Sequence, residues 1–588
     1  MTRVAIVKRS KCNPTKCNYL CIKLCPVNRT GGECIIKAED TKPYINEDLC
    51  NGCSICTNRC PLEALDIVNL PEALKEEPIH RYGKNAFQLF NLPIPQPGKV
   101  IGIIGRNGIG KTTALNILAG HLKPNLGNFE GFDKDAILKR YSTSPLGDFF
   151  KKLYNNKIKL AYKPQRVEQI PETFDGKVKD LLKKVDEKGK LKEYTELLEI
   201  DKILDSNVKE ISGGELQRVA IAAAALKDAQ VIYFDEPSSY LDIKQRLKVA
   251  QFIRSLADKN TAVIVVEHDL ITMDYMADLI HIVYGKPGVY GVISGLKSGK
   301  PGINTYLSGF LREENMRFRD KEIKFGTHAH GAELETEEIA EWPKMKKKLG
   351  SFNLDIDQGY IKEHQVLGIL GSNGIGKTSF MKILAGEIKP DNTKVDLKLK
   401  ISYKPQYLKS ESEETVEQLL KKQAQDYNTK SYKAMIVQPL EINHILQKQI
   451  KTLSGGELQR VSIALCLSKE CDLILMDEPS AYLDIEQRLT LAKTINKVIE
   501  VKECSALIID HDLVFMDSLS QGLLVFEGEA AVKGVLHKPL TMEEGMNQLL
   551  TELKITMRRD EENQRPRINK LDSQMDKKQK KENKYYYS

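Results

Sequence analysis

The chain has 588 residues, of which 41% are hydrophobic and 29% are charged, and its formal net charge at pH 7 is +8. This composition supports about four globular domains and excludes a disordered, collagen-like or disulfide-stapled miniature protein. The longest apolar runs, at 219–226 and 262–266, are far shorter than the roughly 18 residues of a membrane helix, so we expect no membrane partner. The first residues also lack the apolar core of a secretory signal. The mild positive charge permits a nucleic-acid partner without requiring one.

Nine of the twelve cysteines lie between Cys12 and Cys60, and such a cluster in a chain without a visible secretory signal is typical of metal binding. Eight of them form two runs that each end in Cys-Pro. The runs are Cys12, Cys17, Cys21 and Cys25, and Cys50, Cys53, Cys56 and Cys60. The second run has the spacing of bacterial ferredoxins that bind a [4Fe–4S] cluster, and the first is a looser variant. In two-cluster ferredoxins the fourth cysteine of each run ligates the other cluster, so we expect Cys60 to join the first run and Cys25 the second.

A zinc site is the alternative interpretation of these cysteines, since zinc sites with four cysteines also use a Cys-x2-Cys spacing. Two complete runs separated by only about 24 residues favour iron–sulfur chemistry. The ninth cysteine, Cys34, is expected to be a small buried side chain rather than a ligand. Cys466, Cys471 and Cys504 lie in apolar segments and are expected in a hydrophobic core.

Five motifs occur twice, in the same order, along the rest of the chain. The pairs are 105–112 with 371–378, 162–165 with 403–406, 212–219 with 454–461, 235–242 with 477–484, and 267–270 with 510–513. Lys111 precedes Gln165 by 54 residues, but Lys377 precedes Gln406 by only 29, so the first copy carries about 25 extra residues. They fall near 129–157 and predict two short helices with a Ser-Pro-Leu-Gly turn.

Each copy contains Gly-x-x-x-x-Gly-Lys-Thr after an apolar strand and before an apolar-periodic helix. This is the context of a phosphate-binding loop, in which glycines let backbone N–H groups approach the phosphates. Lys111 and Lys377 would reach the β- and γ-phosphates, and the hydroxyls of Thr112 and Thr378 would ligate Mg²⁺. The predicted nucleotide contacts of the two loops are Gly105, Asn107, Gly108, Gly110, Lys111, Thr112 and Thr113, and Gly371, Asn373, Gly374, Gly376, Lys377, Thr378 and Ser379.

An Asp-Glu pair follows another apolar strand in each copy, at Asp235-Glu236 and at Asp477-Glu478. The strand would deliver the aspartate to the Mg²⁺ shell, and the glutamate would polarise an attacking water. A histidine at the end of a further apolar strand would contact the γ-phosphate. The two histidines are His268 and His511. The predicted chemistry is therefore phosphoryl transfer to water.

The repeated Ser-Gly-Gly-Glu signature, with the glutamine of Tyr-Lys-Pro-Gln, resembles the nucleotide-binding domains of ATP-binding-cassette proteins. The resemblance implies an α/β fold in which two such domains face each other head to tail, and the signature of each covers ATP bound to the other. The implied signature contacts are Ser212, Gly213, Gly214 and Glu215, and Ser454, Gly455, Gly456 and Glu457. Gln165 and Gln406 would join the Mg²⁺ shell and the catalytic groups, and both sites should hydrolyse ATP.

The same resemblance implies an aromatic side chain that stacks on adenine upstream of each phosphate loop. Tyr82 and Phe87 are the candidates in the first copy, and Phe352 is the candidate in the second. An ordinary core position is the alternative for each of the three.

A two-cluster ferredoxin segment in front of paired cassettes is similar to the RNase L inhibitor family, subfamily E of the ATP-binding-cassette proteins. The similarity covers essentially the whole chain and includes 80–87, 92–98, 235–247 and 565–573. The expected parts are a ferredoxin-like iron–sulfur domain at 1–75, nucleotide-binding domain 1 at 76–300, hinge arm 1 at 301–342, nucleotide-binding domain 2 at 343–540, and hinge arm 2 with the C-terminal tail at 541–588. The last dozen residues, 577–588, read as a solvated tail.

The family resemblance implies a ribosome-recycling ATPase that uses ATP, Mg²⁺ and two [4Fe–4S] clusters. Closure of the cassettes on ATP would swing the iron–sulfur head and separate the large from the small ribosomal subunit, beside a class-one release factor or a pelota-like protein. The protein would act as a monomer on cytoplasmic ribosomes, with a link to initiation factors and with the nucleus as a second location. Basic side chains in the arms and the insertion would contact rRNA, and some of those in the arms would stabilise the hinge between the two cassettes. They are Arg312, Arg317, Arg319, Lys321, Arg558, Arg559, Arg565 and Arg567, and Lys139, Arg140, Lys151 and Lys152.

Three other functions compete with recycling. An iron–sulfur redox ATPase would couple hydrolysis to electron transfer, but the chain has no flavin or dinucleotide fingerprint for an acceptor. A DNA-repair cassette ATPase would interrupt the cassette with long heptad coils, for which the motif spacing leaves no room. The ATPase half of a transporter would give no reason for a ferredoxin segment.

Overall fold

The computed structural model describes residues 3–69, 77–129, 131–326, 337–395, 397–406 and 412–586. The predicted hinge arm 1 and insertion therefore each include positions outside the described residues, at 327–336 and at Glu130. The chain forms two compact units. The first is Met1–Ser239, Gln251–His268 and Met276–Glu322, and the second is Tyr240–Ala250, Asp269–Tyr275 and Ile323–Ser588.

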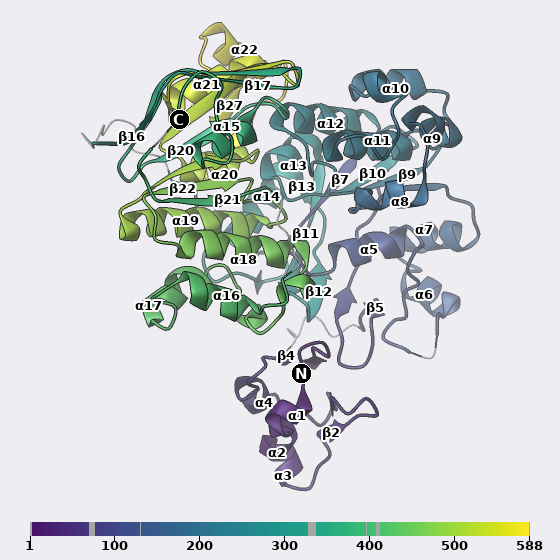
Figure 1. The fold of residues 1–588 in the computed structure, drawn as a ribbon. Helices are drawn as coiled ribbons and strands as arrows, with labels where there is room; N and C mark the ends of the chain where they lie inside the picture. Colours follow the sequence, from purple (N-terminus) through teal and green to yellow (C-terminus); the bar gives the residue numbers. More distant parts are fainter. Residues whose placement is uncertain are drawn as a thin grey trace. The chain divides into compact units, whose positions relative to one another are not determined.

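The N-terminal head of the first unit is built from two small antiparallel two-stranded sheets and four short helices (Figure 1). Strand β1 (Arg3–Val7) pairs with β4 (Leu65–Asn69), and β2 (Ile35–Lys37) pairs with β3 (Pro43–Ile45). The helices are α1 (Pro14–Cys17), α2 (Leu20–Leu24), α3 (Pro26–Arg29) and α4 (Ile55–Asn58). Five buried cysteines pack in the same core as Ala5, Ile35 and Ile45, so the cysteine runs are part of the packing of the head.

Each unit contains one nine-stranded sheet with the same topology. In the first unit the order is β5 (His80–Arg81), β6 (Gln88–Phe90), β12 (Tyr290–Ile293), β11 (Leu279–Lys286), β7 (Val100–Ile104), β10 (Ala262–Val266), β9 (Val231–Asp235) and β8 (Leu160–Lys163), with β13 (Lys297–Ser298) paired to β11. In the second it is β17 (Met345–Leu349), β18 (Phe352–Ile356), β25 (Lys533–Leu536), β24 (Gly522–Glu529), β20 (Val366–Leu370), β23 (Ser505–Ile509), β22 (Leu473–Asp477) and β21 (Ile401–Lys404), with β26 (Leu540–Thr541) paired to β24.

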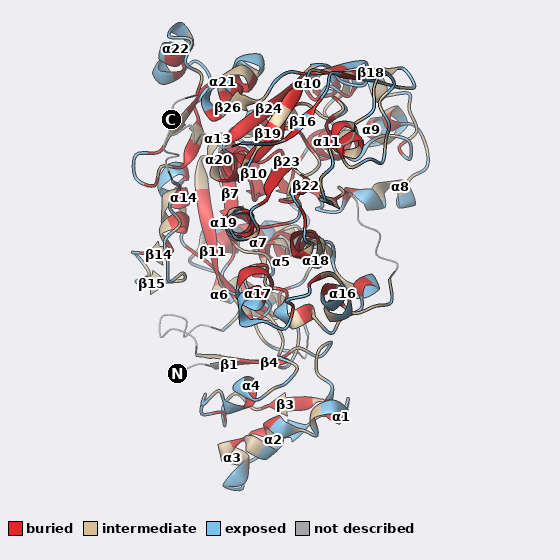
Figure 2. Cartoon of the chain, turned by 60° about the vertical axis from the view of Figure 1, so that its left-hand side comes forward, coloured by how far each residue is buried: buried red, intermediate tan, exposed pale blue. Residues whose placement is uncertain are grey.

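The five strands from β11 to β8 run parallel, as do the five from β24 to β21. Every residue of β7, β9 and β10 is buried, and Figure 2 shows β7 and β10 in the colour of buried residues. Buried parallel strands with continuous apolar sequence are expected where helices cover both faces of a sheet. Their carboxyl ends meet at one edge, where the motif residues follow.

The helices of the two units follow the same motif order. In the first unit they are α5 (Lys111–Leu118), α6 (Lys134–Arg140), α7 (Pro145–Tyr154), α8 (Ile170–Thr173), α9 (Val178–Val185), α10 (Leu191–Leu197), α11 (Gly213–Ala225) and α14 (Gly299–Ser308). Helices α12 (Ile243–Ser255) and α13 (Leu270–Met276) are shared between the units. The second unit has α15 (Lys377–Leu384), α16 (Val416–Gln423), α17 (Lys430–Tyr432), α18 (Gly455–Ser468), α19 (Ile485–Lys502), α20 (Leu513–Leu519), α21 (Met542–Leu553) and α22 (Gln574–Lys581).

Three short antiparallel strand pairs lie outside the head and the two large sheets. They are β14 (Phe310–Leu311) with β15 (Met316–Arg317), β16 (Glu338–Trp342) with β19 (Gly359–Lys362), and β27 (Met557–Arg559) with β28 (Pro566–Ile568).

The extra segment of the first copy folds into α6 and α7, which pack on the hydrophobic core beside α5 (Figure 1). Ile137 and Phe150 are fully buried there, together with Ile117 of α5. The predicted turn at 144–147 is wrong, because Ser144 caps α7 and the following Pro145 occupies its first turn. Proline is well tolerated at that position, since its missing N–H has no partner within a helix.

The prediction of a solvated tail at 577–588 holds for Lys577, Lys578 and residues 581–584, which are exposed, but it is wrong for Gln579 and Tyr586, which are buried. Helix α22 continues to Lys581, and Tyr586 is 3% exposed. The Tyr586 hydroxyl donates to Asp517 at 2.6 Å and accepts from Arg559 at 3.0 Å, while the amides of Tyr585 and Tyr586 both donate to Asn547 at 2.9 Å. The lysine-rich composition hid a segment that is fixed by two tyrosines.

Two substitutions at Tyr586 test this anchoring. We expect Tyr586→Phe to lower the free energy of unfolding by about 1–2 kcal/mol, because the buried Asp517 and Arg559 lose a hydrogen-bond partner. Tyr586→Ala should cost about 3–5 kcal/mol, because the ring also leaves a cavity. Pulse proteolysis in urea, read on peptides of the second unit, measures both, with the exposed Lys584→Ala as the control. Equal stability of the three variants would contradict the anchored tail.

A buried histidine makes the stability of the first unit depend on pH. His281 on β11 is 2% exposed, and burial lowers its pKa to about 4. Its Nδ1 lies 2.7 Å from the carbonyl oxygen of Ser294, and its Nε2 accepts from the Ile94 N–H at 3.3 Å. The folded-state pKa is below the ordinary value near 6.5, so this contribution to stability is complete above that pH and is lost as the pH falls toward 4.

We expect His281→Gln to flatten this pH dependence. Between pH 7 and pH 5 the free energy of unfolding should fall about 2 kcal/mol further in the wild type than in the variant, because only histidine must stay neutral. Glutamine keeps an acceptor for Ile94 and does not titrate. Pulse proteolysis at the two pH values, read on peptides of the first unit, gives the difference, and identical slopes would refute the assignment.

Candidate functional site

The phosphate loops connect the central strand of each sheet to the helix that follows. Gly110 and Gly376 end the loops with φ values of 97° and 103°, in the left-handed region that glycine adopts at low cost. The amine of Lys111 donates to the carbonyls of Gly105 at 2.9 Å and Arg106 at 2.7 Å. Lys377 makes the equivalent contacts with Gly371 and Ser372, both at 2.7 Å. Both loops thus lie between a strand and a helix, and the lysine amine is bound to carbonyl groups of its own loop.

The three adenine candidates occupy two kinds of position. Tyr82 is 55% exposed, and its hydroxyl lies 3.1 Å from the hydroxyl of Thr113 at the start of α5. Phe87 and Phe352 are half-buried beneath the last glycine of each loop, where a Cβ on Gly110 or Gly376 would come within 2.8 or 3.1 Å of the ring. Tyr82 therefore offers an open ring face, whereas the two phenylalanines brace the loop.

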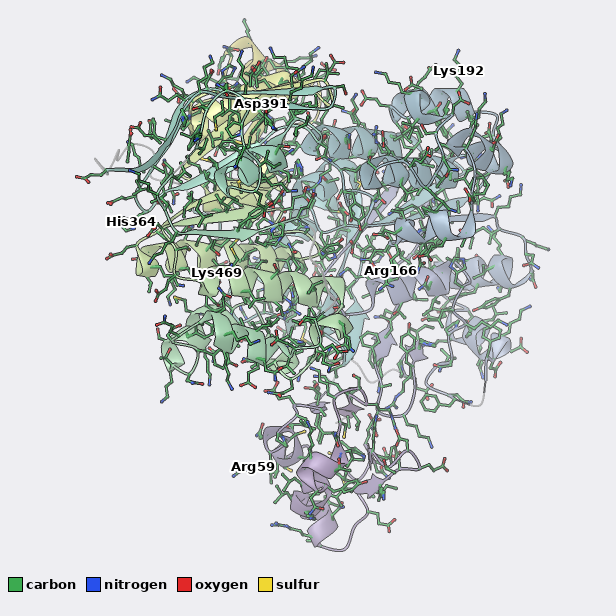
Figure 3. All side chains as sticks on the ribbon, in the orientation of Figure 1. Arg59, Arg166, Lys192, His364, Asp391 and Lys469 are labelled. Atoms are coloured by element: carbon green, nitrogen blue, oxygen red, sulfur yellow. The ribbon has the colours of Figure 1, made fainter. Side chains whose placement is uncertain are left out.

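At the first site, the parallel sheet brings the Asp-Glu pair beside the phosphate loop. The Thr112 hydroxyl donates to Asp235 Oδ2 at 2.9 Å, and the Gln165 amide donates to Glu236 Oε1 at 2.8 Å. His268 Nε2 lies 3.4 Å from the same glutamate oxygen. Five predicted residues from four separate motifs thus converge on one point. Arg166, which follows Gln165, is exposed (Figure 3).

The second site repeats the arrangement. The Thr378 hydroxyl donates to Asp477 Oδ2 at 2.6 Å, and the Gln406 amide donates to Glu478 Oε1 at 2.8 Å. His511 Nε2 lies 3.7 Å from Glu478 Oε1.

The acidic groups of the first site are arranged like those of a cation-binding site. Asp235 is fully buried, and its Oδ1 has no hydrogen-bond partner among the described residues. Burial and the charge of Glu236 raise the pKa of Asp235 to about 6. A divalent cation with oxygen ligands would offset this buried charge, and the hydroxyl of Thr112 lies beside it. The residues present therefore fit Mg²⁺.

The two glutamates differ electrostatically. Burial alone would favour the neutral form of Glu236, but the hydrogen bond and charge of His268 and the charge of Lys111 hold its pKa at about 2. At Glu478 burial prevails and raises the pKa. Burial, Lys377 and Arg246 lower the pKa of His511 far below its ordinary value, so this imidazole is neutral and cannot offset the glutamate.

Sequence reasoning missed two residues that shape each site. Lys163 and Lys404 are 1% exposed, and their amines donate to the backbone carbonyls of Asp235 and Asp477 at 2.9 and 2.8 Å. Burial lowers the pKa of each amine to about 8. The repetition of lysine in both Tyr-Lys-Pro-Gln motifs was the available signal, but a lysine in a strand usually reads as an edge residue.

The second missed pair belongs to the signature helices. The Gln217 amide donates to the carbonyl of Glu236 at 2.7 Å, and that of Gln459 donates to the carbonyl of Glu478 at 2.8 Å. Both glutamates adopt a positive φ, 49° at Glu236 and 47° at Glu478, which these contacts hold in place. Each signature helix is thus linked, through this glutamine side chain, to the catalytic glutamate of its own copy.

The signatures themselves form the N-termini of α11 and α18. Ser212 and Ser454 cap these helices, and Glu215 and Glu457 return the bond to the cap residue, which completes a capping box in each. The serines and first glycines are exposed. Free N–H groups and the helix dipole at such an end attract phosphate oxygens.

In the head, the four cysteines that are predicted to hold the first cluster lie together. A small cavity is lined by Cys12, Cys17, Cys21 and Cys60. Burial and neighbouring thiols from this set raise the pKa of Cys12, and burial raises the pKa of Cys21 to about 11. Four thiols that face one apolar cavity fit a [4Fe–4S] cluster, whose iron ions would stabilise the thiolate forms.

The second group is arranged around Cys50. Burial, Cys50 and Cys53 raise the pKa of Cys56 to about 12. Cys34, which was predicted not to be a ligand, is 1% exposed, and burial with the neighbouring Cys25 and Cys50 raises its pKa to about 12. Cys34 thus lies beside Cys25 of the first run and Cys50 of the second run. Among the described residues, no group of three or more His, Cys, Asp or Glu side chains is arranged to hold a single metal ion.

Comparisons with known proteins agree with this geometry. Residues 2–33 match a possible Fer4-like domain in RNase L inhibitor, residues 43–66 match a 4Fe-4S binding domain, and residues 91–239 and 354–481 match the ABC transporter family. The chain is 48% identical, over its whole length and 97% of the relative, to an uncharacterized ABC transporter ATP-binding protein of Methanocaldococcus jannaschii. It is 45% identical to ABC transporter E family member 1 of Arabidopsis thaliana, with 100% and 99% of the two chains covered.

The chain belongs to the RNase L inhibitor family, subfamily E of the ATP-binding-cassette proteins. Its fold matches, with a TM-score of 0.96 and 49% identity over 100% and 99% of the two chains, a structure described as a model of ribosome-bound archaeal Pelota and ABCE1. A second match, with a TM-score of 0.83 and 47% identity over 88% and 100%, is the archaeal ribosome recycling factor aABCE1 in complex with ribosomal stalk protein aP1.

Membership of this family confirms the predicted fold class of two ATP-binding cassettes with an N-terminal ferredoxin-like iron–sulfur domain. It also confirms that the protein is an ATP-hydrolysing enzyme. The described ranges contain no helix that could cross a membrane.

The basic arms of this family member are only partly available for RNA. Arg565 is fully buried and pairs with Asp274 at 3.3 Å, and Arg567 pairs with Asp274 at 2.6 Å. Arg559 pairs with Asp517 at 3.0 Å, and Arg319 donates to the carbonyl of Tyr306 at 2.7 Å. The expectation of an rRNA contact is therefore wrong for the fully buried Arg565, and intramolecular acceptors engage the guanidinium groups of the other three.

Proposed function

We propose that this protein splits ribosomes into large and small subunits, driven by ATP and assisted by a class-one release factor or a pelota-like protein. Two complete hydrolytic sites joined to an iron–sulfur head carry the proposal, because this combination is shared with relatives associated with the ribosome. One solved relative is ribosome-bound with Pelota, another is called a ribosome recycling factor, and a Saccharomyces cerevisiae relative, 42% identical over 100% and 98% of the two chains, is called translation initiation factor RLI1. In this proposal the protein acts as a monomer on cytoplasmic ribosomes, and its partners include initiation factors.

Hydrolysis follows from the residues at each site. The loop amides and Lys111 hold the phosphates, and Mg²⁺ on Thr112, Gln165 and Asp235 would neutralise charge on the β- and γ-oxygens. Glu236 accepts a hydrogen bond from the attacking water and orients it, while His268 fixes the glutamate. The second site uses the same groups, with Thr378, Gln406 and Asp477 for Mg²⁺, and Glu478 with His511 for the water.

The two copies act as a head-to-tail pair in this proposal. Ser212–Glu215 closes over ATP on loop 371–378, and Ser454–Glu457 closes over ATP on loop 105–112. Contacts inside the second unit support it. The amide of Asn373 in the second loop donates to Asp242 at 2.9 Å, and its side chain donates to the carbonyl of Tyr240 at 3.2 Å. Residues 240–242 belong to the first copy in sequence, so one copy touches the phosphate loop of the other.

Contacts between the head and the first cassette would let the head respond to closure of the cassettes. Glu47 of the head accepts a bond from Arg81 at 2.8 Å, and Asp66 pairs with Lys8 at 2.6 Å and also with Lys286 on β11. Asn85 donates to the carbonyls of Ala5 at 3.0 Å and Ile45 at 2.9 Å. We propose that two clusters, the first on Cys12, Cys17, Cys21 and Cys60 and the second on Cys25, Cys50, Cys53 and Cys56, give this head the rigidity to push between the subunits.

The exposed basic side chains remain the proposed rRNA contacts. They are Arg312, Arg317 and Lys321 in the first arm and Lys139, Lys151 and Lys152 in the insertion, and the half-buried Arg140 and Arg558 adjoin them. Phosphate contacts of this kind would make ribosome binding weaken as salt rises.

A splitting assay tests the proposed function. Anaerobic protein, post-termination ribosomes, release factor and ATP are mixed and separated on a sucrose gradient. Free subunits should appear with the wild type and with Lys192→Ala, an exposed control residue (Figure 3), but not with Glu236→Gln/Glu478→Gln or Cys25→Ser. Intact ribosomes alongside normal ATP turnover would refute recycling, and the redox ATPase would then be the function to test.

A further inference from the structure

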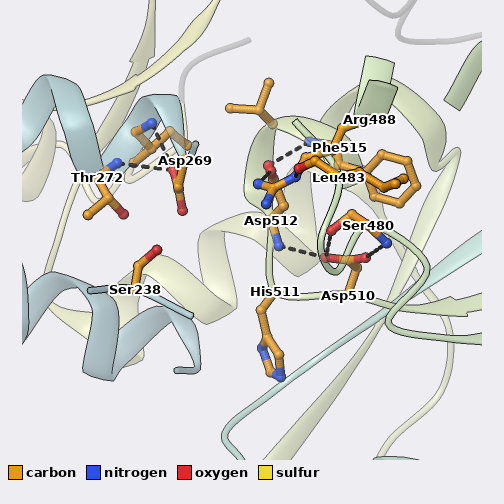
Figure 4. A network of polar contacts seen from close by, with 12 residues as sticks. Ser238, Asp269, Thr272, Ser480, Leu483, Arg488, Asp510, His511, Asp512 and Phe515 are labelled. Atoms are coloured by element: carbon orange, nitrogen blue, oxygen red, sulfur yellow. Dashed lines mark hydrogen bonds and ion pairs between the residues drawn. The ribbon is translucent and has the colours of Figure 1, made fainter. Parts of the chain in front are cut away.

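Inside the second unit, the residues that follow His268 and His511 each belong to a buried ion pair (Figure 4 labels both residues). Asp269 follows His268 in the first copy, and Asp512 follows His511 in the second. Arg246 on α12 pairs with Asp269 at 2.9 Å, and Arg488 on α19 pairs with Asp512 at 2.5 Å. All four side chains are at most 14% exposed. We call Arg246, Asp269, Arg488 and Asp512 the ion cluster.

The charges of each ion pair affect the pKa of the aspartate in the other pair. Arg488 contributes to lowering the pKa of Asp269, after the larger effects of Arg246 and a backbone hydrogen bond that oppose burial. Asp269 in turn helps to raise the pKa of Asp512, after burial. Each aspartate also caps a helix, because Asp269 accepts the Thr272 N–H at 3.0 Å and Asp512 accepts the Phe515 N–H at 2.9 Å. Displacing one pair would leave buried charge without its partner.

Arg246 extends beyond this cluster to the second active site. Its Nε donates to the carbonyl of Leu241 at 2.9 Å, and its Nη1 donates both to Asp269 and, at 3.3 Å, to the backbone carbonyl of His511. The guanidinium group thus joins three segments: the loop after the first Asp-Glu pair, the residue after the first histidine, and the second histidine itself. A planar fork with five donors suits such a junction, whereas an ammonium group is a point charge.

The position of His511 depends on this backbone contact. Both ring nitrogens of His511 are buried without a hydrogen-bond partner among the described residues, so the ring has no side-chain anchor there. Its nearest charged groups are Glu478 at 3.7 Å, Lys377 and Arg246. The main chain must therefore set where the imidazole points. Residues 510–512 are fixed on one side by Ser480, whose hydroxyl donates to Asp510 at 2.7 Å, and on the other by Arg246.

We propose that Arg246, although it lies in the first copy, is a positioning residue for ATP hydrolysis in the second, because it holds the His511 segment in place through the ion cluster. Movement of the loop 240–242 in the first copy then shifts His511 relative to Glu478. The two ATP sites are coupled through a junction of side chains as well as through the signatures. The inference rests on ATP hydrolysis by the second site and not on the ribosome.

The test resolves the two sites with single glutamate variants in the full-length protein without ribosomes. In Glu236→Gln only the second site turns over, and in Glu478→Gln only the first. Adding Arg246→Ala should lower kcat about 10–100-fold in the first background with KM for ATP within about twofold, since displacement by about 1 Å has effects of this size. In the second background, kcat should change less than about threefold.

A conservative variant separates positioning from folding. Arg246→Lys keeps a charge for Asp269 but cannot serve three acceptors, so it should lower second-site kcat by an intermediate factor while Tm stays within about 2 °C of the wild type. Equal losses at both sites, or a raised KM with unchanged kcat, would overturn the proposal, because the arginine would then only support the fold or nucleotide binding. Loss of ribosome splitting with an unchanged site ratio would refute it as well, without affecting the recycling function.

Discussion

Replacing both Glu236 and Glu478 by glutamine should lower steady-state ATP turnover by about 100-fold or more while ATP binding persists. Each carboxylate faces the amide of its glutamine at 2.8 Å and is held at the end of a buried strand. The glutamine that replaces each glutamate has nearly the same shape as the glutamate, so the phosphate loops and the Thr–Asp contacts remain. What is lost is the negative oxygen that accepts a hydrogen bond from the attacking water. A phosphate-release assay measures turnover, and filter binding of labelled ATP measures occupancy.

The matched control removes a carboxylate of the same kind from each unit without touching either site. Glu196 on α10 and Glu500 on α19 are exposed, so Glu196→Gln/Glu500→Gln should keep turnover within about twofold of the wild type. If the catalytic pair of substitutions left more than a tenth of the activity, another group would have to orient the water. If it abolished ATP binding instead, the glutamates would serve the loop and not the reaction.

The central part of each site was predictable because one short motif specifies both its residues and its place. A Gly-x-x-x-x-Gly-Lys-Thr loop after an apolar strand fixes the position of Lys111, and an Asp-Glu pair after another strand must reach the same sheet edge. The contact of Thr112 with Asp235, across 123 residues, follows from parallel strand order and needs no further information. The repeat then predicts Thr378 with Asp477 on the same grounds.

Residues whose role depends on a distant partner were not predictable. Arg565 looks like a solvent-exposed base in its own sequence, and only Asp274, 291 residues away, shows that it is buried in an ion pair. Lys163 gave no local sign that its amine would reach the carbonyl of Asp235. Tyr586 lies in a lysine-rich tail whose composition argues for solvation, but Asp517 and Arg559 hold its hydroxyl. In each case composition describes the neighbours in sequence, whereas burial is decided by neighbours in space.

Replacing Cys25 by serine should remove one of the two proposed clusters, so that bound iron falls from about eight to about four atoms per protein and the charge-transfer absorbance falls by about half. Cys25 is buried, and it lies beside Cys34 next to Cys50 of the second run. A serine hydroxyl is a poor ligand for iron because it keeps its proton near neutral pH, unlike a thiol bound to the metal. Because the head packs around its cysteines, we also expect ribosome splitting to be lost while ATP hydrolysis without ribosomes continues.

Cys34→Ser is the control that separates the loss of a cluster ligand from a change in packing. Cys34 is equally buried and contacts Cys25 and Cys50, so a serine there disturbs the same packing without removing a proposed ligand. We expect about eight iron atoms and unchanged splitting for this variant. Iron loss in Cys34→Ser with retention in Cys25→Ser would exchange their roles, and the second cluster would then be held entirely outside the first run. Four iron atoms in both variants would mean that the thiol of Cys34 is needed to keep Cys25 in place, which the contact between the two side chains would explain.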